Sequence, residues 1–308
     1  MNNSKPKIIL ICGPTAIGKT AAAISVAERF GGEIVGADSM QIYKHMDIGT
    51  AKPTPEERRR VPHHMIDIVA PDALYDAARF SREAREEISA ILQRGCLPVI
   101  AGGTGFYIKA ILYGLFEAAP KDPSIRRRLH EEAVLSGSES LFSRLKACDP
   151  DAAAAIHPND TYRIIRALEV YETSGMTMTA FRGRHGFADI PYNVLKIGLV
   201  MDRQALYERI DGRVDVMMGQ GLLGEVSGLL DAGYQEFLRP MQALGYRHMV
   251  DFIKRRTDWE SAVATLKRDT RHYAKRQLTW FRKDPEIRWF EPDQRDRILS
   301  HAKVFLDS

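Results

Sequence analysis

The hydrophobic and polar positions of the first hundred residues alternate between short apolar runs and longer amphipathic stretches. The apolar runs at 7–12, 33–38 and 97–101 have the length of buried strands. Between them, 21–30 and 78–94 place apolar residues at helical spacing and stop at glycines. Strands that alternate with helices predict a doubly wound α/β fold, a parallel sheet with right-handed helical crossovers.

The pattern changes in the middle of the chain. From about 119 to 191 the segments have helical spacing, with Pro and Gly breaks and no convincing strand. The apolar, β-branched run at 192–201 then predicts a strand that returns to the sheet, and long helices follow. We therefore expect an α/β core built from 1–118 and 192–308, with 119–191 as an inserted helical domain.

Composition and charge only narrow the class of protein. Hydrophobic residues make up 44% and charged residues 27% of the 308 positions, as in an ordinary globular protein. No segment approaches the roughly 18 apolar residues of a membrane-spanning helix. Cys12, Cys96 and Cys148 are far apart, so we expect neither a disulfide framework nor a zinc site, and we expect a cytoplasmic protein. The formal charge of +4 says little about partners.

The stretch CGPTAIGKT at 12–20 contains the strongest local signal. Gly13, Gly18, Lys19 and Thr20 fit the phosphate-loop pattern G-x-x-x-x-G-K-[ST], after a predicted strand and before a predicted helix. Loop amides and the helix N-terminus form a nest for an anion, Lys19 adds a positive charge, and the Thr20 hydroxyl can bind Mg²⁺. A glycine-rich connection alone would not need Lys-Thr there. We predict a phosphate site.

The pattern does not say whose phosphates are bound. An enzyme that cleaves nucleotides needs an acidic Mg²⁺ ligand at the end of a neighbouring strand, but 97–101 is followed by Gly-Gly-Thr. Asp38 instead ends the run 33–38, at the sheet edge where open α/β proteins bind ligands. Position alone allows Asp38 to be a metal ligand, a general base or the N-cap of a following helix.

Six motifs occur in order along nearly the whole chain: GPTAIGKT, ADSMQIYKHMDIGTAKP, PHHMIDI, GGTGFY, ALGYRH and AKRQLTWFRK. Together they resemble the bacterial tRNA dimethylallyltransferases, also called tRNA isopentenyltransferases. The resemblance implies a P-loop α/β core with an inserted helical tRNA-binding domain. It also implies transfer of a dimethylallyl group from dimethylallyl diphosphate to N6 of the adenosine just 3′ of the anticodon, with release of diphosphate. The loop would then hold the donor's diphosphate, with Mg²⁺ as cofactor.

The resemblance also assigns roles to single residues. Asp38 resembles the general base, Thr104 a hydroxyl at the diphosphate and the reacting centre, and Arg209 a further diphosphate clamp, while Thr20 is the expected Mg²⁺ ligand. The implied diphosphate loop is Gly13, Pro14, Thr15, Ala16, Ile17, Gly18, Lys19 and Thr20. The implied tRNA contacts are Asp38, Ser39, Met40, Gln41, Thr104, Arg126, Tyr162, Arg163, Ile164, Ile165, Arg166, Ala243, Leu244, Gly245, Tyr246, Arg247 and His248.

The expected partners are the tRNA anticodon stem-loop and dimethylallyl diphosphate, with no membrane, and we expect a monomer. A small-molecule kinase shares the loop and the fold, but it leaves ALGYRH and the missing acidic strand end unexplained. A non-catalytic RNA-binding P-loop protein is a second alternative, which Asp38 beside the loop disfavours.

Basic clusters at Arg58–Arg60, Arg126–Arg128 and Lys254–Arg256 allow two interpretations. Each suits either a solvated helix face or a nucleic-acid contact. The helix predicted at 265–283 has a basic stripe that suits phosphates or water, formed by Arg268, Arg271, Lys275 and Arg282. Adjacent His63 and His64 point in opposite directions on an extended segment, which disfavours a metal site there.

Overall fold

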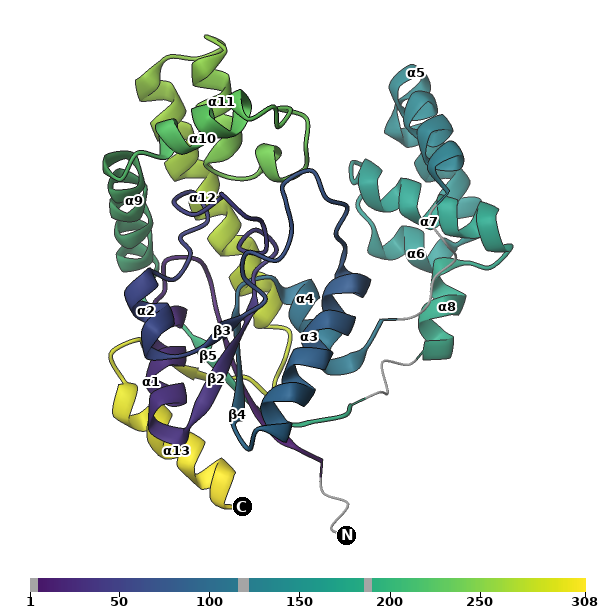
Figure 1. Ribbon diagram of the computed structural model, residues 1–308. Helices are drawn as coiled ribbons and strands as arrows, with labels where there is room; N and C mark the ends of the chain where they lie inside the picture. Colours follow the sequence, from purple (N-terminus) through teal and green to yellow (C-terminus); the bar gives the residue numbers. More distant parts are fainter. Residues whose placement is uncertain (1–4, 116–121, 186–189) are drawn as a thin grey trace. The chain divides into compact units, whose positions relative to one another are not determined.

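The structure, a computed structural model, describes residues 5–115, 122–185 and 190–308 (Figure 1). The chain divides into two compact units. The first is formed by Met1–Leu112 together with Pro191–Ser308, and the second by Tyr113–Ile190. The chain thus leaves the first unit after Leu112 and returns to it at Pro191.

Among the described residues of the first unit, one parallel sheet of six strands lies at the centre, with the order β3-β2-β4-β1-β5-β6. Its strands are β1 (Lys7–Cys12), β2 (Gly32–Ala37), β3 (His63–His64), β4 (Leu97–Gly102), β5 (Asn193–Leu199) and β6 (Arg288–Phe290). The four predicted strands are present with their ends shifted by at most two residues. The short strands β3 and β6 were not predicted.

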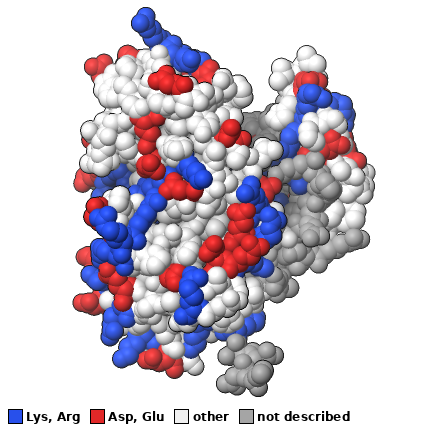
Figure 2. Space-filling view, viewed as in Figure 1, with Lys and Arg blue, Asp and Glu red and all other residues white. Residues whose placement is uncertain are grey.

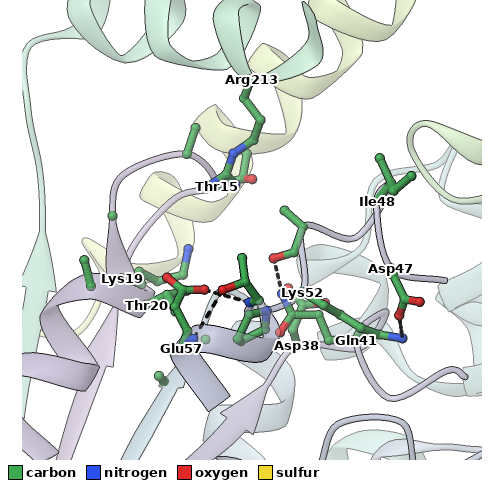
Figure 3. Close-up of a pocket in the computed structure, with 18 of the residues that line it drawn as sticks. Thr15, Lys19, Thr20, Asp38, Gln41, Asp47, Ile48, Lys52, Glu57 and Arg213 are labelled. Carbon is green, nitrogen blue, oxygen red and sulfur yellow. Dashed lines mark hydrogen bonds and ion pairs between the residues drawn. The ribbon is translucent and has the colours of Figure 1, made fainter. Parts of the chain in front are cut away.

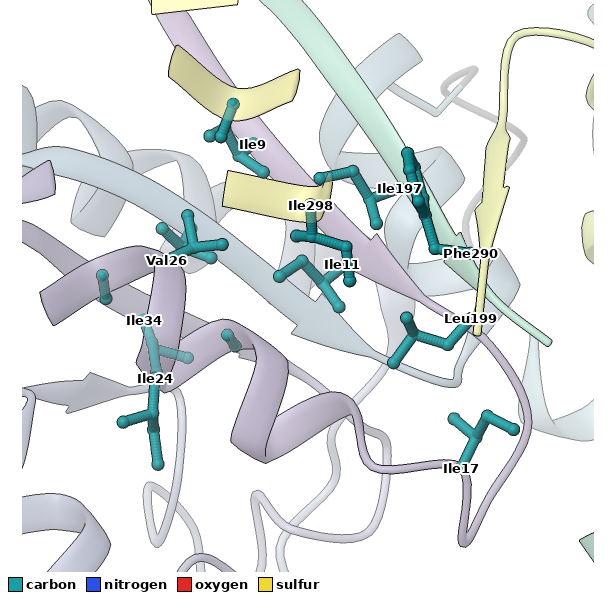
Figure 4. Close-up of a cluster of buried hydrophobic side chains, with 14 of the residues drawn as sticks. Ile9, Ile11, Ile17, Ile24, Val26, Ile34, Ile197, Leu199, Phe290 and Ile298 are labelled. Atoms are coloured by element: carbon teal, nitrogen blue, oxygen red, sulfur yellow. The ribbon is translucent and has the colours of Figure 1, made fainter. Parts of the chain in front are cut away.

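Helices cover both faces of this sheet, which confirms the doubly wound prediction (Figure 1). The helices on one face are α1 (Lys19–Phe30) and α13 (Arg295–Asp307), and those on the other are α3 (Ala77–Gln93) and α4 (Gly105–Tyr113). Ile9 and Ile11 of β1 pack with Ile24 of α1 and Ile298 of α13 (Figure 4). Since side chains alternate along a strand, the buried Ile8 and Leu10 face the other layer.

The remaining helices of the first unit lie toward the carboxyl ends of the strands (Figure 1). They are α2 (Pro55–Arg60), α9 (Arg203–Gly219), α10 (Leu222–Asp231), α11 (Tyr246–Ile253), α12 (Trp259–Phe281) and the 3₁₀ turn Pro240–Gln242. The predicted amphipathic helix at 265–283 is the second half of α12, with Ala274 and Phe281 buried. These helices form the surroundings of the phosphate loop.

The described part of the second unit is helical and has its own core. Its helices are α5 (Pro123–Cys148), α6 (Pro150–Ala155), α7 (Thr161–Ser174) and α8 (Met178–His185). The core contains Leu129, Leu141 and Leu145 of α5 and Ile164 and Leu168 of α7. Across residues 5–115, 122–185 and 190–308, no helix is both long enough and apolar enough to cross a membrane.

Candidate active site

A cavity of about 990 Å³ opens at the carboxyl edge of the sheet in the first unit. The phosphate loop, the segment after β2 and helix α9 contribute to its wall (Figure 3). Lys19, Thr20, Asp38, Arg213 and Tyr273 all line it. This is the edge at which open α/β sheets bind their ligands.

The predicted phosphate loop has the backbone that its glycines require. Gly13 has φ 148°, and a Cβ there would lie 2.9 Å from the Leu199 carbonyl oxygen at the end of β5. Gly18 has φ 100°, which glycine adopts without the cost that a side chain adds. The Ile17 side chain is in the hydrophobic core, so this residue can meet a ligand only through its backbone.

Lys19 is folded back over the loop, where its Nζ donates a hydrogen bond of 2.7 Å to the Pro14 carbonyl oxygen. Desolvation lowers the pKa of Lys19 to about 8, an effect that Asp38 opposes and Arg213 reinforces. Burial also lowers the pKa of Arg213, and the neighbouring charge of Arg209 adds to this. Cations that are poorly solvated and close together favour an anionic ligand between them.

Arg209 and Arg213 lie one turn apart on α9 and therefore share a helix face. The Arg209 guanidinium reaches the loop, since a Cβ on Gly18 would be 3.7 Å from its Nη2. Arg213 lines the cavity but was not predicted from the sequence. The four-residue spacing between Arg209 and Arg213 in the sequence could have identified it as a second cation on the same helix face.

Asp38 follows β2 and stabilises a turn. Its Oδ1 accepts the backbone N–H groups of Met40 at 2.8 Å and Gln41 at 3.4 Å. The chain after Asp38 forms turns rather than a helix, so the helix-cap alternative is wrong. The carboxylate is held by its turn at the cavity wall, on the side facing the phosphate loop (Figure 3).

Thr104 connects the ends of β4 and β2 beside Asp38. Its Oγ1 accepts the Ser39 N–H at 3.0 Å and donates to the Ser39 Oγ at 3.3 Å, while its N–H donates to the Ala37 carbonyl at 3.2 Å. Tyr273 of α12 lines the cavity nearby, and burial, followed by the charge of Asp38, raises its phenol pKa well above the usual range. Tyr273 therefore stays protonated.

Gln277 of α12 joins the phosphate loop to the segment after β4. Its Oε1 accepts the Thr15 N–H at 2.8 Å, and its Nε2 donates to the Gly103 carbonyl oxygen at 2.8 Å. A Cβ on Gly103 would lie 2.3 Å from that Nε2, so a side chain there would displace the Gln277 amide from its hydrogen bonds. Gln277 was not predicted from the sequence. The signal was a polar side chain within the apolar face of the predicted helix.

The predicted tRNA segment on α7 is only partly exposed. Tyr162 and Arg163 are exposed, whereas the side chains of Ile164 and Ile165 lie in the core of the helical unit and are not available to a partner in this structure. Arg166 pairs with the buried Glu169 at 2.8 Å.

Arg126, predicted as a further contact, is held by the same buried carboxylate, at 2.7 Å from Glu169. Loss of Arg126 would leave the buried Glu169 with Arg166 as its remaining charged partner, which should weaken this unit. The half-buried Arg126 is thus a structural residue of this unit as well as a candidate contact.

The predicted segment Ala243–His248 is largely buried. Tyr246 is fully buried, and its hydroxyl donates to Glu225 Oε1 at 2.7 Å. Arg247 pairs with Asp269, and burial lowers the pKa of His248, whose Nε2 lies 3.3 Å from the same carboxylate. In this segment Tyr246 and His248 face the protein interior rather than a partner.

Arginines in each predicted basic cluster already have acidic partners. Arg58 pairs with Asp67, Arg60 with Glu28 and Arg256 with Glu236. On the face drawn in Figure 2, basic side chains gather on the side of the first unit that carries α2 and α9, mixed with acidic ones. These clusters are therefore not uniform positive surfaces.

Among the described residues, no group of three or more His, Cys, Asp or Glu side chains could hold a metal ion. Of the two adjacent histidines, His64 has its Nε2 2.6 Å from the Glu33 Oε2. The Thr20 hydroxyl at the phosphate end of the cavity is the ligand that the loop pattern supplies. Mg²⁺ commonly takes most of its remaining ligands from phosphates and water, so this single donor fits it.

The fold and the site define an α/β protein in which a loop with the phosphate-loop sequence pattern lines a cavity at the carboxyl edge of a parallel sheet. Residues 41–284 match the family model described as IPP transferase. The chain belongs to the IPP transferase family, which confirms the resemblance seen in the six motifs.

Relatives and solved structures agree over nearly the whole chain. tRNA dimethylallyltransferase 2 of Syntrophus aciditrophicus (strain SB) is 55% identical, over 98% of this chain and 97% of that protein. The structure of the tRNA isopentenylpyrophosphate transferase from Bacillus halodurans has a TM-score of 0.74 and 40% identity, covering 98% of this chain and 97% of its own. A eukaryotic dimethylallyltransferase acting on tRNA has a TM-score of 0.80 and 27% identity, over 97% of this chain and 78% of that one.

Proposed function

We propose that the protein transfers the dimethylallyl group of dimethylallyl diphosphate to N6 of the adenosine just 3′ of the tRNA anticodon, releasing diphosphate. It would act as a monomer in the cytoplasm. One observation carries the proposal. In a member of the IPP transferase family, the Asp38 carboxylate and the Lys19 phosphate loop line the same cavity.

The donor's diphosphate would lie in the loop, bound by the amides of 13–20, Lys19 and the cations of α9. As the bond between C1 and its oxygen breaks, the electron pair leaves with the diphosphate. Preorganised positive groups stabilise that developing charge. Thr20 would hold Mg²⁺, which supplies further charge at the phosphates.

The acceptor needs a base, because the N6 lone pair is delocalised into the adenine ring. As the bond between N6 and C1 forms, the Asp38 carboxylate would take the amine proton. Oδ1 is engaged by the turn, so Oδ2 would accept the proton. A carboxylate also accepts hydrogen bonds from an amine edge and selects against a carbonyl. The base would reach this site by leaving the stack of the anticodon loop.

The direct test combines the protein with Mg²⁺, dimethylallyl diphosphate and bulk tRNA, followed by mass spectrometry of the digested nucleosides. We expect N6-isopentenyladenosine. A parallel reaction with ATP in place of the donor tests the kinase alternative. Phosphorylated product without isopentenyladenosine would overturn the proposal.

Donor affinity should fall as pH rises through about 8, the pKa of Lys19. Below that pH the ammonium is charged and attracts the diphosphate. Above it, binding must first take up a proton, so affinity falls by up to about tenfold per pH unit. Titration calorimetry with dimethylallyl diphosphate between pH 7 and 10 measures this. In Lys19→Met this pH dependence of donor affinity should vanish. A decrease that persists in the variant would assign the titration to another group.

Arg163→Glu should weaken tRNA binding several-fold and leave donor affinity unchanged, because Arg163 is exposed on α7 of the helical unit. If Arg163 contacts a phosphate, log affinity should fall less steeply with log salt, with a slope smaller in magnitude by about 0.7. Filter binding at several salt concentrations measures both. Arg163→Lys is the control that retains the charge, and equal affinity of the two variants would remove Arg163 from the interface.

A further inference from the structure

Glu225 on α10 gathers four hydrogen bonds on one carboxylate beside the cavity. Its Oε2 accepts the backbone N–H groups of Asp47 at 2.9 Å and Ile48 at 2.7 Å. Its Oε1 accepts the Gly49 N–H at 3.1 Å and the Tyr246 hydroxyl at 2.7 Å. Three consecutive amides of one loop are thus fixed by a single side chain about 180 residues later in the sequence, and charge-assisted bonds of this kind are roughly twice as strong as neutral ones.

The same loop is packed against Tyr246 from behind. A Cβ on Gly49 would lie 2.5 and 2.7 Å from two carbon atoms of the Tyr246 ring, and 2.9 Å from Leu222. The backbone at Gly49 therefore rests directly on this ring. Tyr246 is fully buried and does not line the cavity, so its contribution is indirect.

Hydrogen bonds connect this loop to the Asp38 turn. The Gln41 Nε2 donates to the carbonyl oxygens of Thr50 and Ala51, both at 3.1 Å. The Gln41 backbone N–H also points to Asp38 Oδ1. Ala51 is held at φ 49°, a left-handed conformation that a non-glycine residue adopts only when its surroundings impose it.

The loop itself forms part of the cavity wall. Asp47, Ile48 and Ala51 line the cavity together with Gln41 (Figure 3). A displacement of 47–51 would therefore change the space beside Asp38 without touching the phosphate loop, to which Lys19 and Thr20 belong.

We propose that Glu225 and Tyr246 are positioning residues that fix the loop 47–51 and, through Gln41, the Asp38 carboxylate for the acceptor. This inference rests on the proposed function. It gives the buried tyrosine of the ALGYRH motif a role behind the cavity wall instead of at the tRNA surface. Their loss should impair the transfer step and spare donor binding.

The test uses Tyr246→Phe, which keeps the ring under Gly49 and removes only the hydroxyl. We expect kcat, with both substrates saturating, to fall by about ten- to hundredfold, the scale of a small misplacement of reacting groups. The Kd for dimethylallyl diphosphate should stay within about twofold. Hydrogen exchange at the amides of Asp47, Ile48 and Gly49 should become faster.

The chain offers a matched control. The buried Tyr75 donates to Glu83 Oε2 at 2.7 Å, the same bond at the same length, outside the cavity wall. Tyr75→Phe should lose a similar amount of thermal stability and keep the parental kcat. Equal losses of kcat in the two variants would make the effect one of stability alone and overturn the inference.

Glu225→Gln provides a second variant. Both carboxylate oxygens accept hydrogen bonds, so an amide nitrogen in place of either one would face N–H or O–H donors and could not accept from them. This variant should show the same split between kcat and donor Kd as Tyr246→Phe. Parental kcat and parental amide exchange in either variant would contradict the inference. An inactive parent protein would overturn the proposed function instead, and the exchange measurement would then still decide whether Glu225 and Tyr246 hold the loop.

Discussion

Asp38→Asn is expected to lower the rate of prenyl transfer at least a hundredfold at saturating tRNA and donor. A general base contributes roughly 10²–10⁴ to a rate, and an amide cannot take up the proton. The asparagine Oδ1 can still accept the Met40 and Gln41 amides, so the turn should persist. Donor affinity and thermal stability should therefore remain near those of the parent.

Asp202→Asn is the matched control. Asp202 Oδ1 accepts the amides two and three residues ahead, at 2.7 and 3.2 Å, as Asp38 does, but it starts α9 outside the cavity wall. Single-turnover measurements on both variants separate the carboxylate's chemistry from its hydrogen bonds. If Asp38→Asn turned over like the parent, proton removal would fall to water or to an oxygen of the departing diphosphate.

Lys19→Ala should reduce kcat/KM for dimethylallyl diphosphate by about 10²–10³, the scale on which removal of one charge-stabilising group acts. The fold should survive, because Lys19 makes its hydrogen bond to a loop carbonyl and contributes nothing to the apolar core. Steady-state kinetics over a range of donor concentrations, with tRNA saturating, measure the effect.

Lys7→Ala controls for the loss of a lysine, since Lys7 Nζ likewise donates to a backbone carbonyl, that of Leu306 at 3.0 Å. Lys7 starts β1 at the opposite end of that strand from the phosphate loop. A wild-type rate for Lys19→Ala would remove the loop lysine from the mechanism. Equal losses in both variants would indicate a general weakening of the fold.

The sequence predicts most of the sheet because its central strands are continuous apolar runs between clear helices. β3 has two residues and β6 has three, too few to show any periodicity. Both pair at the edges of the sheet, where neighbouring strands rather than the local sequence select the extended conformation. Such strands follow from tertiary contacts.

The candidate site likewise has one part that the local sequence predicts and another that depends on contacts between distant segments. The phosphate loop is a local motif, and its spacing alone places Lys19 and Thr20 at the cavity. Gln277 and Glu225 act through bonds to loops more than 170 residues away, which no local pattern encodes. The motif ALGYRH marks Tyr246 as important, but only its burial distinguishes a residue behind the wall from one at the surface.

The phosphate loop is synthesised long before the residues that hold it in place. Its Gly13 fits against the carbonyl of Leu199, and its Thr15 amide is bound by Gln277, 262 residues further along the chain. A nascent chain that has not yet produced α12 therefore lacks the partner that holds Thr15. Closing contacts over so long a separation is slow compared with forming local helices. The proposed donor site is consequently completed late in synthesis, and we expect affinity for diphosphate to arise only once α12 has left the ribosome.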